Sequence, residues 1–139
     1  METNNAGPVA GPAKERRLSL SDFQAYRTFS DDEWQDLPGF PGIQQISLAD
    51  DFDESTRSGR RTRLVRFQPG ARTQTALTHA YWEEAYLLEG DLHFAGAALL
   101  KAPAYRCRPP GTSHGPYDSP RGCIMLELHY WDPAGASKK

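Results

Sequence analysis

The sequence lacks cysteine pairs, long apolar runs and an excess of either charge. Its two cysteines, Cys107 and Cys123, form no C-x-x-C motif and follow no secretory apolar region, so we expect no disulfide framework and a reducing cytoplasm as the location. No apolar run approaches the ~18 residues that a membrane span requires. The formal net charge of −2 offers no basic surface for a nucleic acid. These absences predict a globular protein with neither a membrane nor a nucleic acid as partner.

The 139 residues are enough for one domain with a core of its own. Residues 1–17 hold two Gly-Pro pairs and few apolar side chains, which predicts a flexible segment or one ordered by a partner subunit. Residues 18–42 form an extension, in which a capping box at Ser30 and Glu33 predicts a helix of about two turns before Pro38. Residues 43–131 carry the β-rich region, and residues 132–139 are a tail that we expect to fray.

The region after residue 42 consists of short β-rich runs separated by turn residues. The clearest run covers residues 123–130. Its alternating positions are Cys123, Met125, Glu127 and His129 against Ile124, Leu126, Leu128 and Tyr130. Such alternation has the period of a strand with two different faces. The breaks PG, EGD, PPG and SPRG separate the runs, and many short strands at regular spacing predict an all-β sandwich or barrel.

Residues 77–83 bring potential metal ligands close together. Every second residue of this stretch would share one face of a regular strand. These four are Leu77, His79, Tyr81 and Glu83. An imidazole and a carboxylate are two of the three ligands of a facial iron site or a catalytic zinc site. His114, which follows the rigid turn of residues 109–111, is the candidate for the third ligand.

The residues alone leave other interpretations open. A histidine beside a glutamate is commonly a surface pair or a satisfied buried group. His93 follows a turn, in a strand that we expect to be solvated on one face. His129, in the last strand, either lines a cavity or lies on the surface. Glu84 takes the opposite strand face from Glu83, which predicts a surface or interface residue.

The stretch from residue 70 to residue 90 resembles the first motif of the cupins, small proteins with a double-stranded β-helix. That motif reads G, five residues, H-x-H, three or four residues, E, six residues, G. The matching residues are Gly70, His79 as the second histidine, Glu83 and Gly90. Leu77 stands in the place of the first histidine, and the gap before it is one residue longer than in the motif.

The second cupin motif reads G, five residues, P-x-G, two residues, H, three residues, N. Residues 109–111 and His114 match its centre, whereas Pro103 replaces the leading glycine and Asp118 replaces the asparagine. The resemblance covers residues 43–131 and implies a cupin jelly-roll barrel. Cupins commonly bind iron, manganese, nickel or zinc through three histidines and the glutamate. For this chain the resemblance therefore implies one divalent metal ion held by His79, Glu83 and His114.

The loss of a histidine at Leu77 has two opposite interpretations. It either weakens the site and leaves a metal-poor binding barrel, or it produces a two-histidine, one-carboxylate face with open positions for substrate and O₂. Three protein ligands suffice for catalytic zinc and for non-haem iron, so we expect a metal to be bound, with Fe(II) favoured over Zn, Mn or Ni. A leucine would also make the cavity drier and select an apolar part of the substrate.

The resemblance favours a non-haem iron dioxygenase, an oxidoreductase that acts on a small diketone-like or aromatic substrate. A metal-assisted isomerase or lyase for a sugar or small acid is an alternative, and a non-catalytic ligand-binding or sensor barrel is another, because fold alone does not decide function. The expected substrate-binding residues are Leu77, Tyr105, Cys107 and Met125, with ordinary core packing as the alternative for the last three. Cupins usually pair, so the resemblance implies a homodimer.

Overall fold

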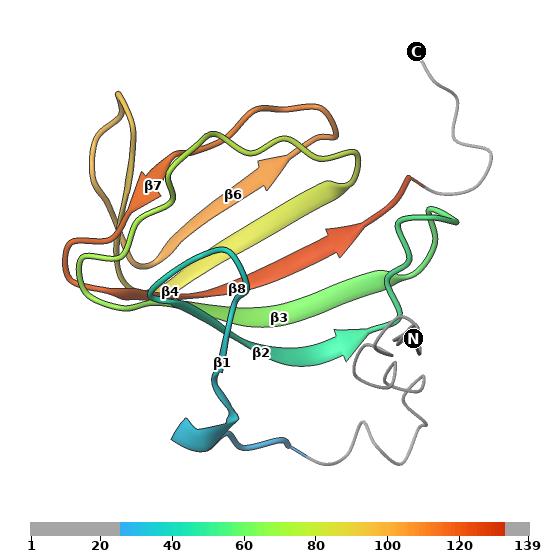
Figure 1. Ribbon diagram of the computed structural model, residues 1–139, viewed down its shortest axis with the longest axis horizontal. Helices are drawn as coiled ribbons and strands as arrows, with labels where there is room; N and C mark the ends of the chain where they lie inside the picture. Colours follow the sequence, from blue (N-terminus) through green and yellow to red (C-terminus); the bar gives the residue numbers. More distant parts are fainter. Residues whose placement is uncertain (1–25, 133–139) are drawn as a thin grey trace, which may run out of the picture.

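The computed structural model describes residues 26–132, which form a curved antiparallel sheet (Figure 1). The strands are β1 (Gln35–Asp36), β2 (Ile43–Asp50), β3 (Arg60–Phe67), β4 (Trp82–Phe94), β5 (Leu100–Lys101), β6 (Ala104–Arg108), β7 (Tyr117–Asp118) and β8 (Cys123–Tyr130). Their order is β1-β2-β3-β8-β4-β5, and β6 and β7 also pair with the long strand β4. The predicted all-β class is confirmed.

One face of the sheet carries the hydrophobic core. Along β8 every second residue is buried, as the alternation in the sequence predicts. Cross-strand pairing places Met125 of β8 against Val65 of β3 and Leu87 of β4. The other buried members of the cluster are Ile43, Phe67, Leu92, Tyr117 and Cys123. Burial of each large apolar side chain favours the folded state by roughly 1.5–3 kcal/mol, so this cluster holds the sheet in its curved form.

The prediction of a two-turn helix before Pro38 is wrong. The chain forms only a three-residue 3-10 turn, η2 (Asp31–Glu33). The capping box itself is present, since the Ser30 backbone N–H donates a hydrogen bond of 2.7 Å to the Glu33 carboxylate. The residues that follow form β1 and pair with the edge of β2. A helix of two turns has little stability of its own, so hydrogen bonds to an existing sheet edge are the better alternative.

The segment between η2 and β2 packs onto the sheet. Leu37 and Phe40 lie against the hydrophobic core, and the guanidinium of Arg66 covers the ring of Trp34 at 4.3 Å from its centroid. The Leu37 backbone N–H donates a 2.9 Å hydrogen bond to the carbonyl of Ile43. The sheet therefore begins within the extension, before residue 43.

Two largely irregular segments, residues 68–81 and residues 109–119 with the short β7, run beside each other and close the barrel opposite the main sheet (Figure 1). Single bridges join Arg72 to Asp118 and Leu77 to His114. At the second bridge, each residue donates its backbone N–H to the carbonyl of the other, at 2.6 and 2.9 Å. These bonds satisfy backbone groups that no regular strand covers.

Residues 77–83 do not form one regular strand, so the shared strand face considered for them does not apply. β4 begins only at Trp82, and the preceding residues pair with the second irregular segment. The N–H of Gly111 donates to the carbonyl of His79 at 2.9 Å, which ties this part of the first segment to the turn of residues 109–111. His79 therefore reaches Glu83 because the segment of residues 68–81 packs against residues 109–119. The two-residue period of a strand is not the cause.

The two ends of the chain and its location in the cell were also predicted from the sequence. The flexible segment predicted for residues 1–17 and most of the predicted tail lie outside the described residues. Within residues 26–132, no helix is long and apolar enough to cross a membrane. The cytoplasmic location stays a prediction.

Candidate metal centre

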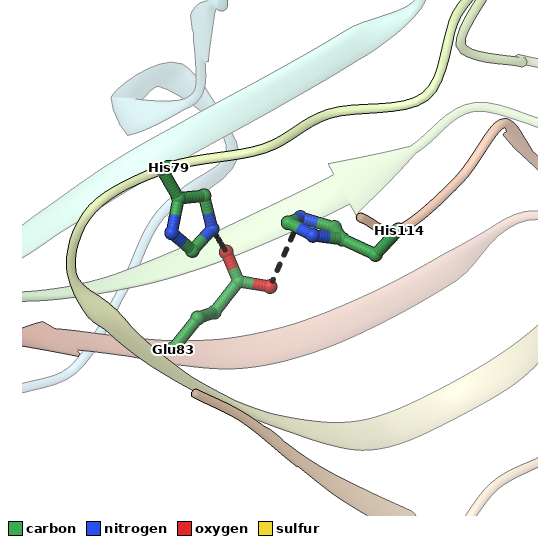
Figure 2. Close-up of side chains that lie close together, drawn as sticks. All are labelled: His79, Glu83 and His114. Carbon is green, nitrogen blue, oxygen red and sulfur yellow. Dashed lines mark hydrogen bonds and ion pairs between the residues drawn. The ribbon is translucent and has the colours of Figure 1, made fainter. Parts of the chain in front are cut away.

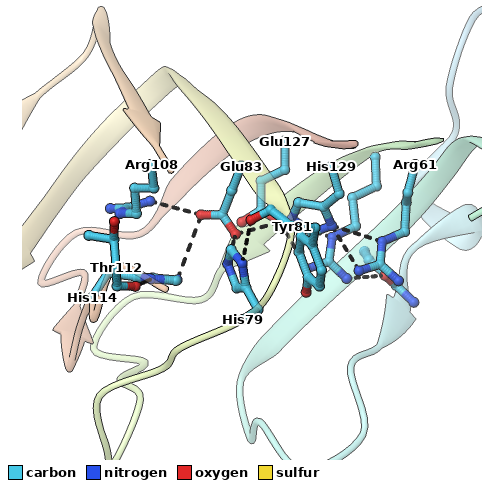
Figure 3. A network of polar contacts seen from close by, with 11 residues as sticks. Arg61, His79, Tyr81, Glu83, Arg108, Thr112, His114, Glu127 and His129 are labelled. Carbon is cyan, nitrogen blue, oxygen red and sulfur yellow. Dashed lines mark hydrogen bonds and ion pairs between the residues drawn. The ribbon is translucent and has the colours of Figure 1, made fainter. Parts of the chain in front are cut away.

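Glu83 is the hub of a buried polar cluster (Figure 2, Figure 3). It is the second residue of β4, and only 7% of its surface is exposed. Its Oε2 lies 3.2 Å from Nε2 of His79 and 3.1 Å from Nε2 of His129. Its Oε1 accepts a hydrogen bond of 2.8 Å from the Arg108 guanidinium and lies 3.9 Å from Nε2 of His114. Nitrogen atoms therefore face both oxygens of the carboxylate.

The orientation of His79 is set by its own loop. Its Nδ1 donates a 2.9 Å hydrogen bond to the carbonyl of Tyr81, and its ring stacks on the Tyr81 ring with centroids 3.9 Å apart and planes 3° apart. A carbonyl only accepts, so Nδ1 carries a proton, and the neutral ring has its lone pair on Nε2. That lone pair faces the Glu83 carboxylate. Two lone pairs at 3.2 Å repel each other, and a metal cation between them would relieve that repulsion.

His114 reaches the same carboxylate from the second irregular segment. Its Nδ1 donates to the carbonyl of Thr112 at 3.3 Å, so its Nε2 also points toward Glu83 as a lone-pair donor. The ring is buried, and it meets the His79 ring edge-on with centroids 4.8 Å apart. A histidine whose other ring nitrogen donates to a backbone carbonyl has the usual arrangement of a metal ligand.

Burial and charge together set the protonation of the cluster. Burial raises the pKa of the Glu83 carboxyl, but its polar contacts, first among them the hydrogen bond from His129, outweigh burial and hold the pKa well below the ordinary value. Burial lowers the pKa of His114, although the charge of Glu83 opposes that shift. An ionised carboxylate and a neutral imidazole are the forms that bind a metal ion.

The three ligands implied by the sequence are brought together by the structure. One ligand atom each from His79, Glu83 and His114 lies within 4.8 Å of the other two. Ligand bonds to zinc or iron are about 2.0–2.2 Å long, so neighbouring ligands around such an ion are roughly 3–3.5 Å apart. The 3.2 Å between His79 and Glu83 already lies in that range, whereas His114, at 3.9 Å from Glu83, would have to move closer to bind the same ion. Two imidazoles and one carboxylate are a donor set that suits iron(II) and zinc.

His129 belongs to the cluster, which the sequence alone left undecided. The residue is only 2% exposed and lies on the inner face of β8, two residues from the buried Glu127. The signal was present in the alternation of β8, because His129 shares its strand face with the apolar residues Cys123 and Met125. That alternation did not say which face was the inner one, and only the pairing of β8 between β3 and β4 settles it.

Arginines beside the cluster were not predicted. Arg108 of β6 pairs in register with Glu83, and Arg63 of β3 pairs in register with Glu127. Both form ion pairs with these partners, at 2.8 and 2.9 Å. No local pattern in the sequence distinguishes them from surface arginines, because their partners come from strands far away along the chain.

A cavity of about 280 Å³ adjoins the cluster. Leu77 and Met125, both predicted to bind substrate, line its wall. Much of the remaining wall is apolar, and includes Leu37, Phe40, Val65, Phe67, Leu92 and Tyr117. The polar groups of the wall include those around Glu83. The cavity therefore suits a small molecule that has one polar end and an apolar body.

Tyr105 and Cys107 do not line this cavity, contrary to the prediction. Tyr105 is 58% exposed, and Cys107 is exposed as well. Along β6 these two residues alternate with Ala104, Arg106 and Arg108, which are more buried. The run AYRCR contains no strongly apolar residue that marks its inner face, so the sequence could not show which set faces inward.

His93 and Asp118 lie apart from the cluster. The Nδ1 of His93 is 2.9 Å from the Asp118 carboxylate, where the ends of β4 and β7 pair. Both side chains are about 40% exposed, and neither lines the cavity. Asp118, which replaces the asparagine of the second cupin motif, thus forms a contact with His93 on the surface of the barrel.

A family model described as the ChrR cupin-like domain matches residues 23–131. The chain belongs to this cupin family. The resemblance drawn from the two motifs is confirmed, and the match includes the segment before β2 that packs onto the sheet. No curated protein matches this cupin.

Solved structures share the fold of this cupin at low sequence identity. An acetylacetone dioxygenase from Acinetobacter johnsonii has a TM-score of 0.62 at 18% identity, covering 93% of this chain and 89% of its own. KdgF from Halomonas sp. has a TM-score of 0.55 at 24% identity, covering 74% and 93%. A chain in the complex of Rhodobacter sphaeroides SigE with the anti-sigma ChrR has a TM-score of 0.53 at 20% identity, covering 68% and 46%. At these identities the likeness concerns the fold.

Proposed function

We propose that this cupin is a mononuclear metal-dependent enzyme with His79, Glu83 and His114 as its metal ligands. One observation carries the proposal: two imidazoles oriented by backbone carbonyls and one ionised carboxylate converge beside a mostly apolar cavity. Buried charges and buried imidazoles are expensive to maintain for stability alone. Perturbed titratable groups that line a cavity are the usual mark of a functional site.

The favoured reaction is that of a non-haem iron(II) dioxygenase on a small oxygenated compound, diketone-like or aromatic. An iron(II) ion would supply Lewis-acid polarisation of the substrate oxygens and the redox chemistry that O₂ requires. The protein would hold the polar end of the substrate near Glu83 and surround its apolar body with Leu77 and Met125. The volume of about 280 Å³ limits the substrate to a small molecule. The fold shared with an acetylacetone dioxygenase supports this class of substrate.

A second candidate is a metal-binding sensor without catalytic activity. The match to the ChrR cupin-like domain and the fold shared with a chain of the SigE–ChrR complex favour it. In that case the same three ligands would bind a metal, and metal binding would change the interaction with a protein partner. The two candidates differ in turnover, and not in metal binding.

Metal binding and oxygen uptake test the proposal together. We expect the metal-free protein to bind close to one equivalent of Fe(II) or Zn²⁺ in titrations followed by elemental analysis. His79→Ala and His114→Ala should each weaken this binding strongly, whereas His93→Ala should not, because His93 lies outside the cluster. The iron form should consume O₂ when β-dicarbonyl compounds are added.

The outcomes separate the hypotheses. Metal binding without O₂ uptake, together with turnover of sugars or small acids, would favour an isomerase or lyase. Metal binding without any turnover would favour the sensor. If the wild-type protein bound no divalent metal and His114→Ala left ligand affinity unchanged, both enzyme hypotheses would be rejected.

A further inference from the structure

Four polar residues form a row across the sheet, one from each of four neighbouring strands. Arg61 of β3 pairs in register with His129 of β8, which pairs with Glu83 of β4, which pairs with Arg108 of β6. Their side chains lie on the inner face and contact one another in the same order (Figure 3). The register of the strands therefore determines which of these side chains are neighbours.

Arg61 determines where the proton of His129 lies. Its Nε and Nη2 lie 2.9 and 2.8 Å from Nδ1 of His129. A guanidinium donates hydrogen bonds and has no acceptor, so Nδ1 of His129 must accept. The neutral ring then carries its proton on Nε2, which lies 3.1 Å from the Glu83 carboxylate. Arg61 itself is held in place, because its guanidinium covers the ring of Phe52 at 4.8 Å from the centroid.

His79 and His114 have the opposite arrangement. Each of them donates from Nδ1 to a backbone carbonyl and turns Nε2 toward Glu83. The group that Nδ1 contacts thus determines what each of the three histidines presents to the Glu83 carboxylate. Two of them face a backbone acceptor and present a lone pair, and the third faces an arginine donor and presents an N–H.

We infer that His129 is a positioning residue that donates a hydrogen bond to Glu83, that Arg61 imposes this role, and that His129 does not replace the ligand missing at Leu77. The inference rests on the proposed metal site and specifies its ligand number as three. Oε2 of Glu83 is held by His129 and Oε1 by Arg108, so the carboxylate is fixed from both sides while His79 and His114 remain free to bind the ion.

The same contacts argue against a second ion beside the first. Glu83, Glu127 and His129 also bring ligand atoms within 4.8 Å of one another. Each of the two added residues already faces a cation, however: Arg63 donates to Glu127 at 2.9 Å, and Arg61 donates to His129. A metal ion there would have to sit among guanidinium groups and displace the proton from Nε2 of His129. The contacts of Glu83 therefore support one ion. Arg61 and Arg63 supply the positive charge that a second ion would otherwise bring.

Nitrogen NMR of the histidine rings tests the inference directly. Long-range ¹⁵N–¹H spectra of the full chain distinguish the two tautomers of each ring. We expect His129 to carry its proton on Nε2, both without metal and after addition of Zn²⁺. His79 and His114 should carry a proton on Nδ1, and their Nε2 signals should shift on addition of Zn²⁺. Arg61→Met removes the donors that face Nδ1 and should release the His129 tautomer, whereas Arg61→Lys keeps a donor and should preserve it.

Zn²⁺ affinity provides a second measurement. His129→Leu should weaken binding by about 10–100-fold, which is typical for the loss of a residue that orients a ligand. His129→Gln keeps an N–H donor near the position of Nε2 and should restore most of that affinity. His114→Gln, the matched change at a ligand, should not restore it. A structural role alone would predict no such difference between the two glutamine variants in folded protein.

Two results would overturn the inference. One is a His129 ring that carries its proton on Nδ1, or that loses the Nε2 proton when Zn²⁺ binds. The other is a His129→Gln variant that binds Zn²⁺ as poorly as His114→Gln. If wild-type protein bound no Zn²⁺, the proposed function would fail instead, and the tautomer in the metal-free protein would still decide the role of His129.

Discussion

At the scale of single residues, Glu83 is the member of the cluster that most of the others contact. Its carboxylate is buried, and it contacts three histidines and one arginine. Removing one member of such a group leaves buried charge without a partner, which costs more than the group contributes when intact. The histidines are therefore coupled to Glu83 in stability, and the proposed metal site depends on the same contacts.

The stability of the metal-free protein should fall as the pH is lowered from about 7.5 to 5. Burial lowers the pKa of His114 below its ordinary value of 6.5, so below that pH the unfolded chain binds a proton at this position that the folded chain resists. The lowered pKa of Glu83 acts in the same direction, below its ordinary value of 4.5. Urea unfolding at several pH values measures the effect.

His114→Gln is the control for this prediction. It should flatten the dependence between about pH 7 and 5.5, because the group that resists protonation is gone. Stability that rises on acidification in wild-type protein would contradict the assignment of a buried neutral imidazole at this position.

Leu77→His should tighten metal binding. Leu77 lines the cavity, and its backbone bridges to His114, so a histidine there would stand beside the proposed ligands. A histidine there would add a fourth ligand, the third imidazole, without loss of the existing three ligands. Calorimetric titration with Zn²⁺ measures the change, and Leu77→Met, which conserves volume but adds no ligand of this kind, is the control. Equal affinity in the two variants would mean that position 77 does not face the ion.

At the scale of elements, two irregular segments position the site. The first supplies His79, the second supplies His114, and the turn of residues 109–111 joins them through the Gly111 N–H. Regular strands supply Glu83, Arg108 and His129 through their register. Loops held on a rigid sheet commonly carry function in this way.

Gly111→Ala should lower stability by about 1–2 kcal/mol and also weaken metal binding. Gly111 has a φ of +78°, a left-handed conformation that alanine adopts only with strain, and no neighbouring atom blocks an added Cβ. Relief of that strain would move the turn that contacts His79. Gly96→Ala is a matched control, since Gly96 has the same φ, equally open surroundings and a place outside the site.

Both glycine variants should lose similar stability in urea unfolding, and only Gly111→Ala should lose Zn²⁺ affinity. If the two variants bound Zn²⁺ equally well, the turn would not be positioning the histidines.

At the scale of the whole molecule, the outer face of β4 and β6 carries large apolar side chains. Tyr86 and Leu88 are each 44% exposed and Tyr105 is 58% exposed. Tyr86 and Tyr105 pair in register, with ring centroids 6.2 Å apart. A group of exposed aromatic and aliphatic side chains on one sheet face is typical of a surface that binds another protein.

The homodimer implied by the cupin resemblance stays a prediction, and this face offers a way to test it. Light scattering of wild-type protein should give twice the mass of the chain. Tyr86→Lys combined with Leu88→Lys should shift the mass toward that of a monomer, because charges would replace the apolar contacts. Arg121→Glu, in the bend before β8, is a charge-changing control. A monomeric wild-type protein would contradict the prediction.

The sequence by itself determined the fold and the chemistry of the proposed ligands. Alternation in the β8 segment and regular turn residues identified an all-β domain, because a strand with one buried face repeats every two residues. Two spaced motifs identified the cupin family and proposed His79, Glu83 and His114 as ligands. These features are local, so a linear pattern records them.

The tertiary structure alone decided which faces turn inward and which residues surround Glu83. Strand pairing placed His129 and Arg108 beside it, turned Tyr105 and Cys107 outward, and drew the residues after η2 into an edge strand in place of a helix. Each of these results depends on partners distant along the chain. The physical reason is that hydrogen bonds and ion pairs form between neighbours in space, and the order of residues specifies such neighbours only after the chain has folded.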